Sequence, residues 1–96
     1  MYVVRDIFTA KPGMASKLAK LMKEVMTMPN SPRARILTDL VGDYNTVVME
    51  SEYKDLASYE KMMQEYTSQP PELRQKMAGY TDLWQSGRRE VLRVVD

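Results

Sequence analysis

The sequence predicts an α+β fold: one ferredoxin-like domain over residues 1–96, with the order βαββαβ and a four-stranded antiparallel sheet. Two observations carry this prediction. Four short runs rich in β-branched and aromatic residues alternate with segments in which apolar residues recur at helical spacing. The chain is also only 96 residues long, which is enough for one domain.

The first half of the chain predicts a strand, a helix and a β-hairpin. Residues 2–10 end at a Lys-Pro-Gly turn, and the amphipathic helix after that turn runs to about Thr27. A Pro-bounded loop follows at 28–32. Two strand-like runs separated by Gly-Asp then indicate a hairpin with a two-residue turn, because glycine supplies the positive φ that such turns require. We expect these antiparallel strands at 33–41 and 44–53, with the turn at Gly42-Asp43.

The second half predicts two further helical pieces and a last strand. Asp55 can cap the first piece, whose apolar stripe contains Leu56, Tyr59, Met63 and Tyr66. Gln69-Pro70-Pro71-Glu72 interrupts this piece, and Pro71 suits the first turn of another helix. We expect the inner stripe of that helix to hold Leu73, Met77, Tyr80 and Trp84. Gly87 fits the stop of that helix, and residues 88–95 then form the fourth strand.

These elements predict a sheet with both faces apolar. Right-handed crossovers give the strand order 4-1-3-2 and put both helical regions on one face. Adjacent apolar pairs such as Val3-Val4 and Val47-Val48 place hydrophobic side chains on the other face as well. Since no segment remains to cover that face, we expect a homodimer through sheet-to-sheet packing.

The composition excludes several classes of function. The 14 basic and 13 acidic residues leave a net charge of +1, which argues against nucleic-acid and membrane partners. The absence of histidine and cysteine excludes imidazole bases, thiolate nucleophiles, zinc sites and His-ligated haem, so we expect no metal and no cofactor. RNA-recognition domains share the βαββαβ order, but residues 44–53 lack their base-stacking motif. No leader or membrane span is evident, and we expect a cytoplasmic protein.

Three stretches resemble a known family. The opening YVVRDIFTAKPG, the central YNTVVMESEYKDLASYEKM and the closing SGRREVLRVV are similar to NIPSNAP proteins and, more broadly, to the dimeric α+β-barrel superfamily that includes antibiotic-biosynthesis-type monooxygenases. The resemblance implies a barrel built from two monomers' sheets, with a cavity between sheet and helices. Members bind apolar or aromatic small molecules, and some oxidise them without metal or flavin. The haem-degrading relatives use a histidine, which this chain lacks, so haem degradation is not expected.

Five residues are candidates for a ligand site. Trp84, beside Tyr80, is either a core residue or the wall of a site for a flat aromatic ligand. Asn45 either bonds to backbone near its turn or stabilises an enolate or phenolate oxygen. Arg5 and Glu50 either form a cross-strand ion pair or line a polar patch of the cavity.

The face to which Arg5 points decides its role. Toward the helices it would anchor a ligand anion, and toward a partner sheet it would help to specify the dimer. Strand parity puts Asp6 on the opposite face. We therefore expect a small-molecule-binding dimeric α+β-barrel protein. Its enzymatic form would be a cofactor-independent monooxygenase acting on an aromatic or apolar metabolite, with either a carboxylate such as Glu50 as the base or a substrate that ionises by itself. The alternative is a non-catalytic interaction or structural module. No catalytic residue is identified from the sequence.

Overall fold

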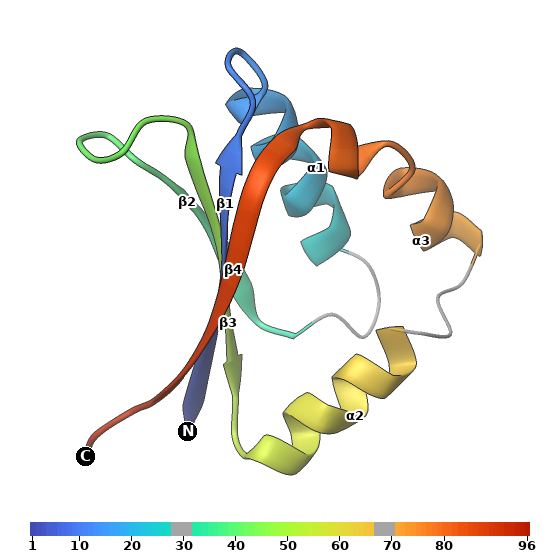
Figure 1. The fold of residues 1–96 in the computed structure, drawn as a ribbon. Helices are drawn as coiled ribbons and strands as arrows, with labels where there is room; N and C mark the ends of the chain where they lie inside the picture. Colours follow the sequence, from blue (N-terminus) through green and yellow to red (C-terminus); the bar gives the residue numbers. More distant parts are fainter. Residues whose placement is uncertain (28–31, 67–70) are drawn as a thin grey trace.

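Strands and helices follow the predicted order in the computed structural model, which describes residues 1–27, 32–66 and 71–96. They are β1 (Tyr2–Ala10), α1 (Ala15–Met26), β2 (Ala34–Thr38), β3 (Thr46–Tyr53), α2 (Leu56–Tyr66), α3 (Pro71–Lys76), the 3-10 turn η1 (Tyr80–Asp82) and β4 (Trp84–Arg93). All pairings in the sheet are antiparallel, in the order β2-β3-β1-β4, which confirms the predicted 4-1-3-2. The helices lie together on one face of the sheet (Figure 1). None of the helices in the described ranges is long and apolar enough to cross a membrane.

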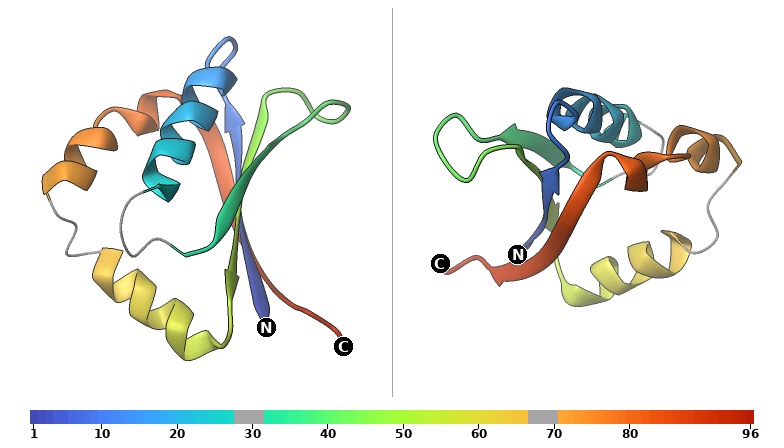
Figure 2. Two further views of the ribbon diagram at one scale, coloured as in Figure 1. Left: turned by 180° about the vertical axis from the view of Figure 1, so that it is seen from behind. Right: turned by 45° about the horizontal axis from the view of Figure 1, so that its top comes forward.

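The core lies between α1 and the middle of the sheet. Leu18 and Met22 are one turn apart on α1, so they share a stripe, and both are buried. They pack against Val47 of β3 and Ala10 of β1. Partly buried apolar side chains surround this centre, among them Phe8, Ile36, Met49, Tyr80, Leu83 and Trp84. Seen from behind and from above, α1, α2 and α3 stay on the same side of the sheet (Figure 2).

Alternation along the strands assigns every sheet residue to one of two faces. Val4, Phe8 and Ala10 are buried or packed against the core, so the even-numbered residues of β1 face the helices. The odd-numbered residues of β1, and their register partners, point to the opposite side, which we call the open face. No described helix covers the open face, and its apolar side chains are Val3, Ile7, Leu37, Val48 and Leu92.

The hairpin between β2 and β3 keeps its predicted register but not its predicted turn. Pairing is symmetric about Gly42-Asp43, with Thr38 opposite Val47. The prediction of a two-residue turn is wrong. The strands stop early, and the carboxylate of Asp39 accepts a hydrogen bond from the Thr46 backbone N–H at 3.0 Å. The positive φ values fall instead on two non-glycine residues, Tyr44 at 66° and Asn45 at 56°. A wide loop therefore replaces the tight turn.

The last helix is much shorter than predicted. Helix α3 ends at Lys76, and Gly79 adopts the left-handed conformation, with φ 79°, that ends the helical segment before η1. Trp84 is consequently the first residue of β4 and not a helix residue, and β4 begins four positions before the predicted start at Arg88. Gly87, predicted as the helix stop, lies within β4 opposite Phe8.

The start of α2 confirms a sequence prediction. The Asp55 carboxylate accepts a hydrogen bond from the Ser58 backbone N–H at 2.7 Å, the geometry of a helix N-cap. The predicted loop at 28–32 lies, apart from Pro32, outside the described residues, and so do Gln69 and Pro70 of the predicted break. Pro71 begins α3, as the sequence predicts.

Candidate functional site

Three aromatic rings meet where β4 begins. The Phe8 ring lies 5.2 Å from the Trp84 ring and 6.5 Å from the Tyr80 ring, and Tyr80 and Trp84 are 6.0 Å apart, all measured between ring centroids. Backbone bonds hold the segment in place: η1 closes through the Leu83 N–H to the Tyr80 carbonyl, and the Lys11 N–H bonds to the Leu83 carbonyl. Such tilted and edge-on pairs are the favoured aromatic geometries, so the rings form a packed wall.

Gly87 makes room for this ring cluster. A Cβ atom added at Gly87 would lie 2.9 Å from Cδ1 of Phe8, closer than real Cβ contacts allow. A side chain here would force the Phe8 ring out of its present position. The glycine is therefore explained by a close tertiary approach inside the sheet.

The indole of Trp84 carries an unmatched hydrogen-bond donor. Its Nε1 atom is buried, and no described residue accepts its hydrogen. A buried N–H usually finds a partner, because leaving it unpaired costs about 1–3 kcal/mol. The donor lies on the helix-facing side of the sheet, among the rings of Phe8 and Tyr80.

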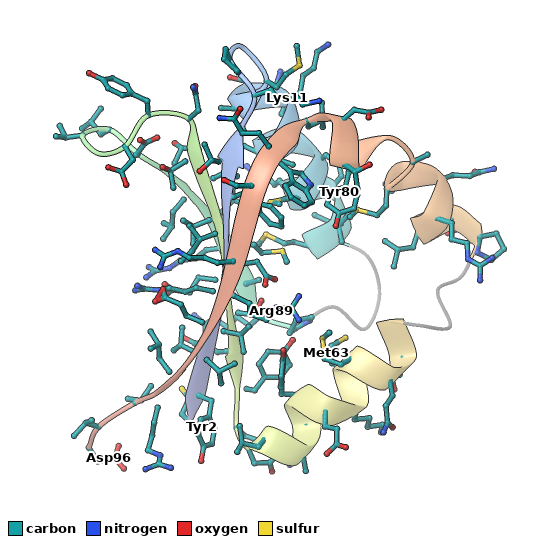
Figure 3. The ribbon with its side chains drawn as sticks, viewed as in Figure 1. Tyr2, Lys11, Met63, Tyr80, Arg89 and Asp96 are labelled. Carbon is teal, nitrogen blue, oxygen red and sulfur yellow. The ribbon has the colours of Figure 1, made fainter. Side chains whose placement is uncertain are left out.

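A polar cluster lies farther along the same side of the sheet. Arg89 of β4 is opposite Asp6 of β1, and its Nε donates to the Asp6 carboxylate at 2.5 Å. Nη1 of Arg89 donates to the Tyr59 hydroxyl at 3.1 Å and to the Met63 sulfur at 3.4 Å, both on α2. Figure 3 shows Arg89 extending from β4 toward Met63. The cluster links the edge of the sheet to α2.

The surroundings of Arg89 act on its pKa in opposite directions. Burial alone would lower the pKa of the Arg89 guanidinium. The hydrogen bond to Asp6, the negative charge of Asp6 and the hydrogen bond to Tyr59 together outweigh burial and raise that pKa. Strand parity already separated Asp6 from Arg5, but Arg89 was missed because the fourth strand was predicted to begin only one residue before it.

The open face carries a row of charges across all four strands. Arg35, Glu50, Arg5 and Glu90 are successive register partners. The predicted Arg5 to Glu50 pair is confirmed, with Nε of Arg5 at 2.9 Å from the carboxylate, and Arg35 adds a second pair at 2.7 Å. Glu50 is only 8% exposed because the two arginines cover it. Although burial by itself would raise the pKa of Glu50, the bonds and charges of the arginines hold it below its ordinary value.

Asn45 lines a separate cleft of about 690 Å³ between α1 and the loop that joins β2 to β3. The lining comes from residues 15–20 and 38–46, so Trp84 and Tyr80 lie outside it. The Asn45 carbonyl accepts a hydrogen bond from the backbone N–H of Ala10 on β1. On its other side, Ala10 is the register partner of Trp84 on β4. Asn45 and Trp84 thus flank one β1 residue, about 10 Å apart across the sheet.

The structure brings together only some of the predicted site residues. Trp84 and Tyr80 are neighbours on the helix-facing side. Arg5 and Glu50 lie on the open face, so within one chain they do not share a site with the two aromatic rings. Among the described residues, no three acidic side chains cluster in a way that would hold a metal ion.

The fold has close structural counterparts. An uncharacterized NIPSNAP domain protein from Burkholderia xenovorans matches 99% of this chain and 95% of its own with a TM-score of 0.79 and 18% identity. A NIPSNAP family protein from Agrobacterium tumefaciens matches 99% and 86% with a TM-score of 0.84 and 15% identity. An antibiotic biosynthesis monooxygenase matches the whole of both chains with a TM-score of 0.67 and 16% identity.

The chain has the NIPSNAP-like ferredoxin fold. This confirms the resemblance noted in the sequence, which extends over nearly the whole chain. No protein-family model matches the sequence, and no curated protein sequence matches it significantly. At identities below 20%, the structural likeness establishes the fold and leaves the chemistry to be argued from the residues.

Proposed function

We propose that the protein binds a small, largely apolar or aromatic molecule between the sheet and its helices. The observation that carries this proposal is the buried indole N–H of Trp84, which has no acceptor among the described residues. A ligand oxygen within hydrogen-bond reach would remove the cost of that unpaired donor. The rings of Phe8 and Tyr80 supply apolar surface for a flat molecule beside it.

The enzymatic form of this proposal is a cofactor-independent monooxygenase. One structural neighbour is named an antibiotic biosynthesis monooxygenase, and that name supports the oxygenase part of the proposal. Such an enzyme needs a base or a self-ionising substrate. Glu50 is poorly suited to be that base beside Trp84, because it lies on the open face and is held by Arg5 and Arg35. Asp6 is a carboxylate on the helix-facing side, but it is paired with Arg89, so a substrate that ionises by itself fits these residues better.

We also propose that a second copy of the chain covers the open face, in a cytoplasmic homodimer. Apolar side chains such as Leu37 and Leu92 are about 40% exposed there, and burying them against a partner is favourable. The row of alternating charges is self-complementary. A two-fold axis parallel to the strands would reverse the row, so that each arginine would face a glutamate of the partner.

The dimer is tested by light scattering on a variant of the open face. Ile7→Lys puts a charge among the apolar residues there and is expected to give monomers at micromolar concentration. Lys17→Glu, an exposed change on α1, is the control that should stay dimeric. A monomeric wild type would contradict the proposal.

Ligand binding is tested by titrating small phenols while following Trp84 fluorescence, and catalysis by oxygen uptake with hydroquinone. Trp84→Phe, which lacks the only tryptophan and is therefore titrated by calorimetry beside the wild type, is expected to show reduced phenol affinity, because phenylalanine lacks the donor. Absence of any saturable change with every phenol would refute binding. If hydroquinone drives oxygen uptake equally in wild type, Trp84→Phe and Asn45→Ala, these residues are not the site of that reaction.

A non-catalytic interaction module is the second candidate. The observation that favours it is the close packing of Phe8, Tyr80 and Trp84, together with the full pairing of Glu50 by two arginines. The same titrations separate the two candidates, because a structural module would leave Trp84 fluorescence unchanged by every phenol.

A further inference from the structure

The Arg89 cluster lies on the same face as the rings but is not needed to pack them. Asp6 and Arg89 face each other across β1 and β4, and α2 brings Tyr59 and Met63 over them. Arg89 is directed away from its strand into the region between the sheet and α2 (Figure 3). The cluster therefore places charged groups on the side of the sheet where a ligand is proposed.

The guanidinium of Arg89 keeps hydrogen-bonding capacity for a ligand. An arginine has five N–H donors. Nε is used by Asp6 and Nη1 by Tyr59 and Met63, whereas no described residue accepts a hydrogen bond from Nη2. The Arg89 side chain is also 43% exposed. A ligand atom could therefore bond to Nη2 without displacing the present partners.

Charge balance selects the kind of ligand atom. Asp6 already neutralises Arg89, so a second carboxylate would leave the cluster with an excess negative charge in a partly desolvated place. A neutral oxygen, such as a hydroxyl or carbonyl, accepts from Nη2 without that cost. The cluster thus favours a neutral acceptor.

The spacing of the strand positions that carry the two donors indicates the length of the ligand. Asp6 pairs with Arg89, and Ala10, four residues farther along β1, pairs with Trp84. Four residues of a strand span about 13 Å. Phe8 lies between the two points on the same face and presents its ring to Trp84.

We propose that Arg89, held in place by Asp6 and Tyr59, is a second anchor of the ligand site, and that the ligand is an elongated aromatic molecule with a neutral oxygen at each end. One oxygen accepts from Nη2 of Arg89, the other accepts from Nε1 of Trp84, and the rings lie along Phe8. This inference rests on the proposed function, since it uses the same face and the same Trp84 donor.

The test is calorimetric titration of a matched pair of probes, para,para′-dihydroxybiphenyl and para-hydroxybiphenyl, which differ only in the second hydroxyl. Wild type is expected to bind the diol about tenfold more tightly, the effect of one additional hydrogen bond to a charged donor. Arg89→Met is expected to bind both probes equally, because only the Trp84 donor remains for a hydroxyl. Arg88→Met, which removes the same charge from the open face, is expected to keep the tenfold preference.

A double variant covers the case in which Arg89→Met leaves Asp6 unpaired and fails to fold. Asp6→Asn/Arg89→Met removes both charges together and should also bind the two probes equally. The Arg89 anchor is overturned if wild type does not prefer the diol to the mono-ol, or if that preference survives in both Arg89 variants. In either case, binding of the mono-ol would still support the proposed function. If neither probe binds wild type, the proposed function and the anchor both fail.

Discussion

Gly87→Ala tests the close contact that shapes the ring cluster. The new methyl group would lie 2.9 Å from Cδ1 and 3.1 Å from Cε1 of Phe8, and the third nearest atom is the Ile7 carbonyl oxygen at 3.6 Å. The ring cannot retreat freely, because it also contacts Trp84 and Tyr80. Overpacking of this kind costs about 1–3 kcal/mol, and each kcal/mol lowers the Tm of a domain of this size by about 4–8 °C.

The assay is thermal unfolding followed by circular dichroism and Trp84 fluorescence at one fixed protein concentration, because a dimer's Tm depends on concentration. Ser86→Ala, an exposed neighbouring change that adds no atoms, is the control and should leave the Tm nearly unchanged. Phe8→Leu should make the alanine at position 87 less costly, because it removes the ring that the methyl group meets. A Gly87→Ala protein as stable as Ser86→Ala would refute the contact argument.

Two further predictions concern stability and pH. Asp55→Ala removes the N-cap of α2 and should lower the Tm by a few degrees. The hydrogen bonds to Ser58 lower the pKa of Asp55, so the cap should stabilise the wild type at neutral pH and be lost as pH falls through that lowered pKa. A series of Tm measurements against pH would reveal this loss. Burial alone would raise the pKa of Glu50, but Arg5 and Arg35 lower it from the ordinary 4.5. The ionised Glu50 therefore stabilises the fold above pH 4.5, and this stabilisation is lost as pH falls through the lowered pKa. Glu50→Gln should therefore be less stable than wild type at neutral pH and lose less on acidification; equal acid sensitivity of the two proteins would contradict this account.

The topology and the charge pairing were predictable because their signals are local or follow from strand parity. The run of β-branched and aromatic residues at 2–10 ends at turn residues, and Asp55 stands where a cap is needed. Once β1 and β3 are neighbours, pairing of Arg5 with Glu50 follows, because burial of an unpaired charge is costly. The register of the hairpin was also recoverable, since it is symmetric about Gly42-Asp43.

The end of the last helix was not predictable from spacing alone. Leu73, Met77, Tyr80 and Trp84 recur at helical intervals, but α3 ends at Lys76, before the second of them, and the left-handed Gly79 lies between the second and third. Gly87 was taken for the helix stop because local sequence cannot reveal its contact with Phe8, which is almost the whole chain away. The same error in placing β4 concealed Arg89, whose partners Asp6 and Tyr59 come from other elements.

The turn geometry depended on side chains that compete with the hairpin. The hydrogen bond from the Thr46 N–H to the Asp39 carboxylate replaces part of the ladder, and Tyr44 and Asn45 adopt positive φ in place of glycine. This loop carries Asn45 into the cleft beside α1 and away from the rings. Sequence reasoning could identify Asn45 as polar and close to a turn, but not which side of α1 it would reach.

The single tryptophan makes the central claim directly measurable. In a nitrogen-15 labelled protein Trp84 gives one indole N–H signal, and an unpaired N–H that donates to a ligand oxygen should shift downfield as para-hydroxybiphenyl is added and reach saturation. Binding of a ligand between the sheet and helices predicts that saturable shift. An indole signal that keeps its position throughout the titration would contradict the account.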